Sequence, residues 1–486
     1  MTDRAAKAAD ASNIPDGFYL PPPVKIASAK TLSFGDVHVR VPILNATTLS
    51  DIINLLTASQ EQYLSLQPIA ALLEIVDAAV SRWQKPDNPL RKLAEESLPA
   101  ITGLSPSMIR TALTRHFESW RIEPLRRALQ HALGDIRMLD EFRPSGEDPA
   151  RWVRAVGPRI STHILAGNIP GLGATELLIT LLTKSACLCK VSSDEPLLTA
   201  LFARTLIEVE PRLAGCLAVV WWPGGSREAK GLEEVAFSRS ELVTATGSNE
   251  AVAAVQQQMA ERRLVSTRFI GYSHRVSLSL IGRESIGTRE ELRAAAKNAA
   301  MDVAMYDQQG CLSPHVIYVE TGGNHTPHEF ARLLGQELNR LEQELPRGPV
   351  ETKISARLHQ VRSMAEIRQA DGKVSAVFKS ETGTLWTVIC DDDATFALSP
   401  LHRTIRVKTV GDLNYVIPLL EPWRPHLQAA GLLVSEARRT SLAGALAGVG
   451  VNRICPVGAL QFPPAGWPQE GRRFIADRVR WVALES

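Results

Sequence analysis

Cys311 is the residue of this 486-residue chain whose sequence surroundings most clearly predict a reactive side chain. It lies in the segment DQQGCLSPH, residues 307–315, between a run typical of a helix (290–306) and a run typical of a strand (316–320). A cysteine on a short turn after a glycine can present its sulfur to a cleft, where a thiolate is a good nucleophile toward a carbonyl carbon. The alternative is a buried, inert cysteine, which is what most free cysteines are.

Two histidines, His274 and His315, could act as acids or bases near such a thiol. A single histidine next to a strand is more often packed or hydrogen-bonded than catalytic. The sequence therefore assigns neither histidine a role, and His315 would tune the Cys311 thiolate only if its ring faced the sulfur.

Asn168 lies in the turn 167–173, directly after a short apolar strand predicted at 160–166. Its side-chain amide is a donor that could stabilise an oxyanion, although asparagine also suits a turn with left-handed backbone. The turn contains a G-x-G pattern but not the full G-x-G-x-x-G fingerprint, because position 176 is Glu176. A standard dinucleotide-binding loop is therefore not predicted there.

Lys190 stands near the end of a second predicted strand, 187–192, and is followed by Ser192 and Ser193. A lysine at a strand end can contact ribose hydroxyls or a phosphate group. The alternative is an ordinary solvated surface lysine.

Two further turns contain glycine. Gly224 and Gly225 follow a predicted strand at 216–222, and Gly247 with Ser248 opens a helix after another strand. The first N–H groups of a helix and its dipole favour an anion such as a pyrophosphate. Glycine and serine also occur at such positions for capping alone, so this signal is weak without its neighbours.

Strands and helices alternate from residue 160 to about 272, which is the pattern of a parallel sheet with helices on both faces. Ligands of such sheets bind beyond the carboxyl ends of the strands. The turns at Gly167, Ser192, Gly224 and Gly247 all follow strands. We therefore expect them to converge on one edge of the sheet.

The length predicts two or three domains, and the alternating pattern predicts an α/β protein. The predicted divisions are a weakly ordered N-terminus at 1–30; a part at 31–272 that begins with helices and contains the alternating strands and helices, with its core at about 150–272; a second unit at 273–455 that contains Cys311; and a tail at 456–486 that packs back or serves oligomer contacts. Smaller elements expected are a strand pair at 30–43, amphipathic helices at 66–83 and 107–133, a long helix at 327–345 and a β-rich stretch at 376–410.

The composition is that of an ordinary globular protein, with 45% apolar and 22% charged residues. A net charge of +2 gives no reason to expect nucleic acid or a membrane surface as a partner, and no apolar run approaches the roughly 18 residues of a membrane span. The N-terminus lacks the apolar core of a signal peptide. Cys187 and Cys189 alternate without a matching zinc-ligand pair, so no metal site is predicted. These features predict a cytoplasmic, reduced protein.

Taken together and in order, the chemically suggestive segments resemble the LuxC-type acyl-CoA reductase family, the reductases of bacterial fatty-acid reductase complexes, within the aldehyde dehydrogenase superfamily. The resemblance covers about residues 150–486, and the N-terminal part follows more loosely. The segments that carry it are LAGNIPG (165–171), KVSSDEP (190–196), TGS (246–248), DQQGCLSP (307–314), GVNRI (450–454) and WPQEG (467–471).

This resemblance implies an aldehyde dehydrogenase-like α/β fold with two parallel-sheet domains after a helical N-terminal part: a nucleotide-binding domain within 31–272 and a catalytic domain at 273–455. It also implies specific roles. Cys311 matches the superfamily nucleophile, which forms an acyl-enzyme thioester, and Asn168 matches the oxyanion-stabilising asparagine, assisted by the backbone N–H of Cys311. Lys190 matches the lysine at the adenosine ribose, and Gly247 with Ser248 matches the turn at the pyrophosphate and nicotinamide. Ser192, Ser193, Gly224 and Gly225, at the same edge, are predicted to bind the cofactor with them.

Two departures from hydrolytic aldehyde dehydrogenases follow from the same comparison. The glutamate base of those enzymes is missing, because the corresponding stretch, 268–272, reads RFIGY without a carboxylate. Hydrolysis of a thioester should then be slow. Ser193 stands where NAD-preferring members often carry a glutamate that binds the ribose 2′-hydroxyl, and a serine beside Lys190 can accept a 2′-phosphate, which favours NADPH.

The sequence therefore predicts an NADPH-dependent reductase of fatty acid metabolism, of the type found in luminescent bacteria, that converts an acyl-CoA or acyl-protein thioester to an aldehyde. An acyl-transferring partner protein and a homo-oligomeric state belong to this prediction. Two alternatives stay open: an oxidative or CoA-acylating aldehyde dehydrogenase, and a catalytically silent scaffold of the same fold. Chain length, acyl donor and direction cannot be read from these residues.

Overall fold

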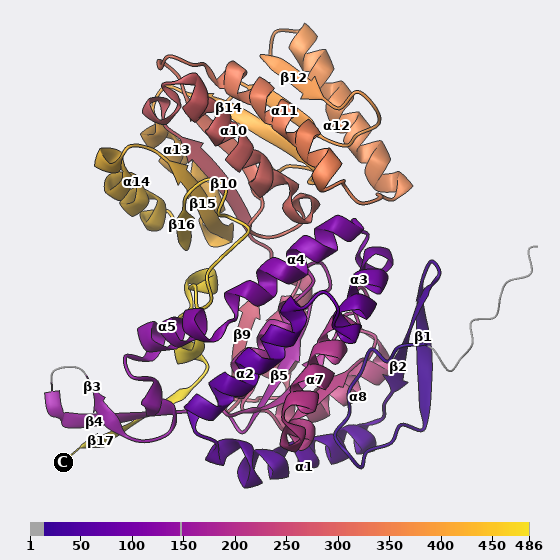
Figure 1. Cartoon of the computed structure of the whole chain (residues 1–486). Helices are drawn as coiled ribbons and strands as arrows, with labels where there is room; N and C mark the ends of the chain where they lie inside the picture. The colour runs from indigo at the N-terminus through magenta and orange to yellow at the C-terminus, as the bar shows by residue number, and fades with distance from the viewer. Residues whose placement is uncertain (1–13, 146–147, 486) are drawn as a thin grey trace, which may run out of the picture. The chain divides into compact units, whose positions relative to one another are not determined.

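The computed structural model describes residues 14–145 and 148–485, which form two compact units (Figure 1). Unit 1 comprises the chain up to Thr102, Phe117–Ser273 and the segment from Ile475 on, and unit 2 comprises Gly103–His116 and His274–Phe474. The predicted weakly ordered N-terminus lies partly outside the described residues.

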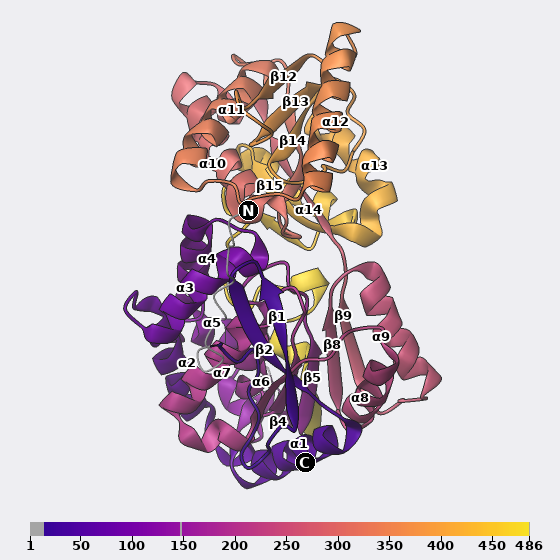
Figure 2. The same ribbon diagram turned by 90° about the vertical axis from the view of Figure 1, so that its right-hand side faces the viewer.

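Unit 1 is built on a five-stranded parallel sheet in the order β7-β6-β5-β8-β9. Its strands are β5 (Ile160–Ile164), β6 (Ala186–Lys190), β7 (Leu217–Val220), β8 (Leu242–Thr246) and β9 (Arg268–Tyr272). Their crossover helices are α6 (Leu172–Leu182), α7 (Leu198–Val209), α8 (Arg227–Ser238) and α9 (Asn249–Glu261). Figure 2 shows α8 and α9 on one side of the sheet and α6 and α7 on the other. β6 and β7 are buried throughout, as strands covered on both faces must be.

The strand order reverses at the central strand β5. The chain winds outward through β6 and β7 on one side, then returns to lay β8 and β9 on the other. Because all five strands are parallel, the turns at Gly167, Ser192, Gly224 and Gly247 follow the carboxyl ends of β5, β6, β7 and β8. The predicted convergence of these turns on one edge is confirmed. The carboxyl ends of the paired strands β5 and β8 mark the topological switch point, outside which such sheets bind ligands.

The N-terminal part begins with the predicted strand pair, an antiparallel hairpin of β1 (Ser28–Phe34) and β2 (Val37–Ile43). The helices that follow are α1 (Ala46–Gln62), α2 (Ile69–Gln84), α3 (Pro89–Thr102), α4 (Pro106–Ser119) and α5 (Ile122–Leu133). The single helix predicted at 107–133 is wrong, because the chain breaks between α4 and α5. Pro124 has no N–H to donate and would clash with the preceding turn of a continuous helix, so a new helix begins just before it. Asp77 of α2 holds this start: it accepts a 2.9 Å hydrogen bond from the Ile122 N–H and pairs with Arg121 at 2.6 Å.

A small antiparallel sheet, β17-β4-β3, joins the end of the chain to unit 1. Its strands are β3 (Arg143–Ser145), β4 (Asp148–Val156) and β17 (Arg480–Glu485). Just before β17, Arg478 forms a buried bidentate ion pair with Glu176 of α6. The last residues of the chain are therefore fixed to unit 1 by strand pairing and by a buried charge.

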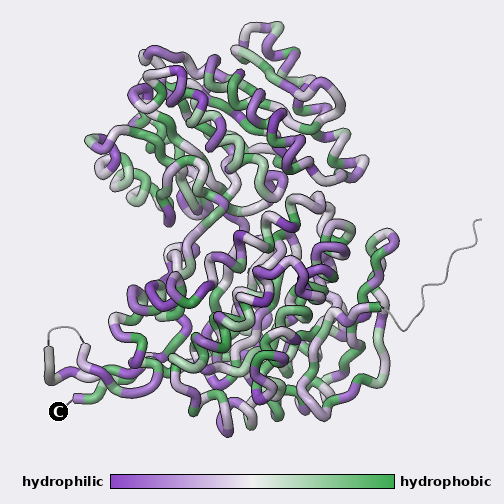
Figure 3. The backbone as a smooth tube through the Cα atoms, in the orientation of Figure 1, coloured by the Kyte–Doolittle hydropathy of each residue, from purple (hydrophilic) through white to green (hydrophobic). Residues whose placement is uncertain are grey.

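Unit 2 contains a seven-stranded sheet in the order β12-β13-β14-β11-β10-β15-β16, parallel except for the β12–β13 pair. Its strands are β10 (Val276–Ile281), β11 (Pro314–Glu320), β12 (Ala376–Lys379), β13 (Thr387–Asp391), β14 (Thr404–Val410), β15 (Leu427–Leu433) and β16 (Arg453–Cys455). Its helices are α10 (Arg289–Ala304), α11 (Pro327–Glu344), α12 (Thr352–Ala370), α13 (Val416–Leu420) and α14 (Glu436–Gly448). Hydrophobic and hydrophilic residues alternate along the helices of both units (Figure 3), which lets one side of each helix pack on its sheet.

No single helix among the described residues has both the length and the apolar character needed to cross a membrane. Only α1 with its continuation to Leu66, taken together with α2 across a bend of 109°, meets that criterion, and it does so by length and composition alone.

Candidate active site

The turn that carries Cys311 has a rare backbone conformation. After α10, the three residues 306–308 all have positive φ angles, of 53°, 51° and 65°. None of them is glycine, and such residues persist only where the surroundings hold them. Asp307 provides the hold: its carboxylate accepts a 2.9 Å hydrogen bond from the Gly348 N–H and lies 2.7 Å from the buried guanidinium of Arg403. The chain is thereby reversed before β11 begins.

Hydrogen bonds from side chains also fix the turn that carries Cys311. The Ser277 hydroxyl on β10 donates to the carbonyl oxygen of Cys311 at 2.8 Å and accepts from the Ala429 N–H on β15 at 3.2 Å. The amide of Gln308 donates to the carbonyl of Pro314 at 2.8 Å, which closes the loop across the cysteine. Cys311 is an exposed residue of this turn, while neighbouring atoms crowd its thiol. Its role as the nucleophile stays a prediction.

The wall beside the turn comes from the late part of the chain. Leu312 packs with Leu460 and Trp467 in a small apolar cluster. Asp302 of α10 holds the backbone of this cluster, because its carboxylate accepts hydrogen bonds from the N–H groups of Gly458 at 2.6 Å and Leu460 at 3.0 Å. The residues that follow β16 are therefore anchored against the element that leads into the nucleophile turn.

Two opposite charges face the thiol. Burial by surrounding atoms and the carboxylate of Glu470 raise the pKa of Cys311 to about 11, against the opposing effect of Arg275 and of the N–H groups of Cys311 and Leu312. Arg275 and Glu470 form an ion pair with each other. The resting sulfur is a protonated thiol at neutral pH, so attack on a carbonyl requires loss of its proton.

His315 does not tune this sulfur through its Nδ1 atom. That nitrogen accepts a hydrogen bond from the Ser399 N–H at 3.0 Å. Burial, with a smaller contribution from His274, lowers the pKa of His315 to about 4, so its ring is neutral and serves packing in β11.

In unit 1, the remaining predicted residues lie at the carboxyl edge of the five-stranded sheet: Lys190 ends strand β6, and the others lie in the turns that follow the strands. Asn168 is exposed in the turn after β5. Gly167 brings this turn against the one after β6, because a β-carbon at position 167 would lie 2.8 Å from the backbone nitrogen of Glu195. Ser192 caps the second turn by accepting from the Asp194 N–H at 3.1 Å.

The two helix starts at this edge are capped by serine. Ser248 accepts from the Ala251 N–H at 3.2 Å at the start of α9, and Ser226 accepts from the Ala229 N–H at 3.1 Å at the start of α8. Gly224 and Gly225 precede α8 with open space at both α-carbons, and Gly225 has a positive φ of 75°. Gly247 precedes α9, so the glycine turns lie where helix dipoles can meet a phosphate.

Lys190 is buried at the end of β6, with only 8% of its surface exposed. Burial lowers its pKa, and the nearby carboxylates of Glu233 and Asp194 oppose that effect. Glu233, on α8, is also buried and has one oxygen, Oε2, that accepts no hydrogen bond from any described residue. A buried carboxylate oxygen without a donor is rare and calls for a partner, which water, an ion or a bound molecule can supply.

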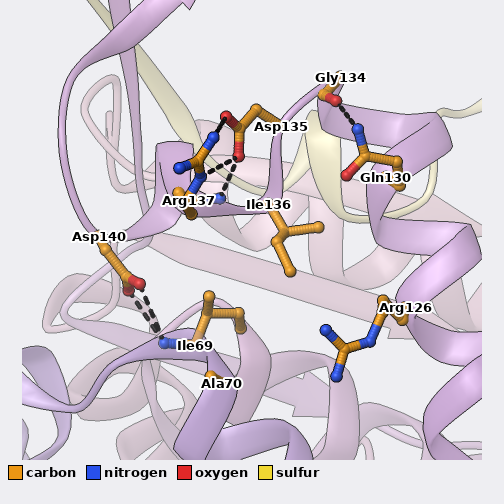
Figure 4. A pocket seen from close by; sticks show the side chains of 9 residues that line it. All are labelled: Ile69, Ala70, Arg126, Gln130, Gly134, Asp135, Ile136, Arg137 and Asp140. Atoms are coloured by element: carbon orange, nitrogen blue, oxygen red, sulfur yellow. Dashed lines mark hydrogen bonds and ion pairs between the residues drawn. The ribbon is translucent and has the colours of Figure 1, made fainter.

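An open cavity of about 560 Å³ lies elsewhere in unit 1, between the start of α2 and the end of α5 (Figure 4). Asp140 stands at its edge, where both carboxylate oxygens accept from the Ile69 N–H. No predicted site residue lines this cavity. Among the residues that the structure describes, no group of three or more metal-ligating side chains occurs.

Several residues at these sites were not predicted from the sequence. Arg275, Ser277 and Arg403 act on the Cys311 turn from far along the chain, and no local pattern marks them. Glu470 lies inside the segment WPQEG that carried part of the resemblance, which was the only signal that pointed to it.

The two parallel-sheet units and the cysteine turn define an α/β protein with an aldehyde dehydrogenase-like fold. Aldehyde dehydrogenase 21 from Physcomitrella patens, solved with succinate, matches over 97% of this chain and 98% of its own, with a TM-score of 0.73 and 14% identity. A 1-pyrroline-5-carboxylate dehydrogenase from Thermus with bound NAD matches over 97% and 92%, with a TM-score of 0.70 and 13% identity. The predicted fold class is confirmed.

The sequence pattern of the acyl-CoA reductase (LuxC) family matches residues 64–481, and the chain belongs to that family. A long-chain acyl-protein thioester reductase from Aliivibrio fischeri is 26% identical over 460 residues, which cover 93% of this chain and 88% of the relative. The predicted family and the predicted enzyme class, an acyl-CoA reductase among the oxidoreductases that act on aldehyde or oxo groups, are confirmed.

Proposed function

We propose that this protein reduces an acyl thioester, a fatty acyl-CoA or an acyl group on a protein, to an aldehyde with NADPH, through a covalent thioester on Cys311. The observation that carries the proposal is the position of Cys311, an exposed residue on a turn that Asp307 and Ser277 hold in a strained conformation. A fixed turn orients the nucleophile before the substrate arrives, which removes part of the entropic barrier.

The chemistry follows from the residues. Cys311 loses its proton, its sulfur attacks the acyl carbonyl, and the thiol of the donor leaves with one proton. The N–H of Cys311 and the amide of Asn168 are the proposed donors to the oxyanion. When bound, NADPH supplies the hydride that adds to the carbonyl carbon of the Cys311 thioester. The carbon–sulfur bond then breaks, which releases the aldehyde and returns the thiolate of Cys311.

The absence of a carboxylate at 268–272, the strand β9, supports reduction over hydrolysis. No base is available there to activate water, so the thioester on Cys311 survives until it is reduced. The name of the Aliivibrio relative supports an acyl-protein donor. The runner-up functions are an oxidative or CoA-acylating dehydrogenase and a silent scaffold.

The residues of unit 1 fit a dinucleotide. The switch point between β5 and β8, the capped helix starts of α8 and α9, and the unpartnered Oε2 atom of Glu233 are features that a nucleotide would complete. We propose that Lys190, Ser192, Ser193, Gly224, Gly225, Gly247 and Ser248 hold it. A cytoplasmic location, a homo-oligomeric state and an acyl-transferring partner protein remain predictions.

The deciding experiment mixes the purified protein with NADPH and a series of acyl-CoA and acyl-carrier-protein thioesters. We expect loss of NADPH absorbance, aldehyde formation and, without NADPH, one acyl group on Cys311 by mass spectrometry. Cys311→Ala should abolish all three, while Cys455→Ala should retain them. No NADPH oxidation with any donor would favour the scaffold, and acylation of another cysteine in the variant would refute the assignment of the nucleophile.

A further inference from the structure

Lys30 and Ser193 both interact with the ring of Trp221, at the edge of the unit 1 sheet. Trp221, directly after β7, donates from Nε1 to the hydroxyl oxygen of Ser193 at 3.1 Å. The ammonium group of Lys30 lies 5.5 Å from the centroid of the same ring. Trp221 is only 5% exposed, so it is a rigid platform, whereas Lys30 is exposed on a flexible stem.

The strand that carries Lys30 is fixed to this edge. Tyr19 extends the sheet beyond β7 through two hydrogen bonds with Val219, of 2.9 and 2.7 Å. Arg204 of α7 donates to the carbonyls of Asp16 and Phe18, and the Gly17 N–H donates to the carbonyl of Arg40 on β2. The β1–β2 hairpin is therefore anchored to β7 and α7, and Lys30 stays near Trp221 even though its own side chain is mobile.

The geometry leaves the Ser193 hydroxyl free to donate. A serine hydroxyl has one hydrogen and two acceptor lone pairs. Because Trp221 can only donate, Ser193 must accept in that bond, and its own hydrogen points elsewhere. A donor hydroxyl beside an ammonium group is a pair suited to a phosphate, which offers only acceptors and carries close to two negative charges.

Glu233, a carboxylate near Lys190, is an acceptor and not a donor. Glu233 accepts from Trp222 Nε1 with Oε1 at 3.4 Å, while its buried Oε2 lacks a donor among the described residues. That oxygen is suited to accept from a hydroxyl and not to contact a phosphate.

We propose that Lys30, a residue outside the family segments, completes a subsite for the 2′-phosphate of an adenosine ribose with Ser193, and that Glu233 accepts the neighbouring 3′-hydroxyl. This inference rests on the proposed binding of a nicotinamide dinucleotide by unit 1, and it names the residues that select NADPH over NADH. The 3′-hydroxyl is common to both cofactors, so Glu233 contributes to both, whereas Lys30 contributes only where the phosphate is present.

The test measures binding of two small probes to the full chain by calorimetry: 2′,5′-ADP, which carries the phosphate, and 5′-AMP, which does not. Lys30→Gln should weaken 2′,5′-ADP about tenfold or more, as loss of a charged hydrogen bond does, and leave 5′-AMP unchanged. Lys85→Gln removes an exposed lysine at the end of α2 and is the matched control, expected to change neither probe. Equal binding of 2′,5′-ADP to Lys30→Gln and the wild type would overturn the role of Lys30.

The role of Glu233 is tested with 3′-deoxy-AMP, which lacks only the hydroxyl in question. The wild type should bind it several-fold more weakly than 5′-AMP, and Glu233→Gln should reduce that difference. An unchanged difference in a folded variant would refute the contact. Failure of the wild type to bind any probe would refute the nucleotide site itself, and equal wild-type affinity for 2′,5′-ADP and 5′-AMP would refute the NADPH preference, whatever the variants do.

Discussion

Asp307 and Arg403 form a buried ion pair that joins two turns of the same rare conformation. The closest atoms of the pair lie 2.7 Å apart, and the Arg403 side chain is fully buried. Asp307 is the middle residue of the left-handed run 306–308, and Arg403 ends the left-handed run 401–403, in which φ ranges from 52° to 68°. Each such residue costs about 1–3 kcal/mol, so the pair and its hydrogen bonds hold both turns against their own strain.

Asp307→Asn should therefore damage both stability and the nucleophile. The change leaves the Arg403 charge buried beside only Glu342, and breaking a buried pair from one side costs about 3–5 kcal/mol. Once the turn relaxes, acylation of Cys311 should fall at least tenfold. Chemical unfolding and the rate of acyl-enzyme formation by mass spectrometry measure the two effects.

The matched control is the exposed pair of Arg439 and Glu436, whose side chains are 60% and 85% exposed. Arg439→Gln should cost less than about 1 kcal/mol and leave acylation unchanged. If Asp307→Asn behaved like this control, the pair would not be what holds the turn.

Ser277 and Ser279 provide a second comparison on a single strand. Ser277→Ala removes the hydrogen bond to the Cys311 carbonyl and leaves the buried Ala429 N–H without an acceptor, for a loss of about 1–3 kcal/mol. Ser279, two residues on, is buried and its hydroxyl makes no hydrogen bond to any described residue. Ser279→Ala should be neutral or stabilising, and melting temperatures compare the two. Equal destabilisation by both changes would contradict the role of Ser277.

The charges at Arg275 and Glu470 should shift the pH dependence of Cys311 alkylation in opposite directions. The wild-type rate should keep rising with pH toward the pKa of about 11. Glu470→Gln removes a negative charge, which lowers the pKa of the thiol and moves the profile to lower pH. Arg275→Gln removes a positive charge and moves it to higher pH. An interaction of about 1 kcal/mol changes the rate about fivefold at a fixed pH below the midpoint.

Iodoacetamide alkylation followed by peptide mass spectrometry measures this profile, since it reports Cys311 separately from the buried cysteines. The double variant should lie between the single ones. A profile that moved the same way in both single variants would show that the changes act through misfolding and not through charge.

Sequence periodicity was sufficient to predict the elements that carry the candidate site. Alternating apolar runs gave the order of β5 to β9, and parallel pairing then required the turns at Gly167, Ser192, Gly224 and Gly247 to meet at one edge. The helix before Cys311 and the strand after it were predicted for the same reason. These are local patterns, because a strand or helix buried on a sheet repeats its apolar residues at a fixed spacing.

Periodicity could not predict the contacts between residues that lie far apart in the sequence. The start of α5 is held by Asp77, which lies 45 positions before Ile122. The Cys311 turn depends on Arg403, 96 positions from Asp307, and the charge beside its sulfur depends on Glu470, 195 positions from Arg275. In the sequence alone each of these residues resembles an ordinary surface charge, because only the fold brings its partner close.

Gly167 should not tolerate a side chain, because its β-carbon would meet backbone rather than a movable side chain. Gly167→Ala places that carbon 2.8 Å from the Glu195 nitrogen and forces apart the turns that follow β5 and β6. We expect a loss of about 1–3 kcal/mol in stability and a weaker affinity for NADP+. Gly231→Ala, in α8 with open space around it, should instead stabilise by up to about 1 kcal/mol. Similar results for the two changes would contradict the close approach of the turns.

Asp302 should make the stability of the protein fall as pH rises from about 4 to about 7. Burial raises the pKa of this carboxyl to about 7 from 3.8, against the hydrogen bonds from Gly458 and Leu460. Between those values the folded protein holds a proton that the unfolded chain has lost. The free energy of unfolding therefore falls with each unit of pH until the folded pKa is passed, by roughly 4 kcal/mol in all.

The difference in unfolding free energy between the wild type and Asp302→Asn should therefore decrease over this range and stay flat above it. A flat or rising difference for Asp302→Asn would mean that the carboxyl is ionised in the folded protein throughout, held as an anion by the two N–H groups that anchor the wall beside Cys311.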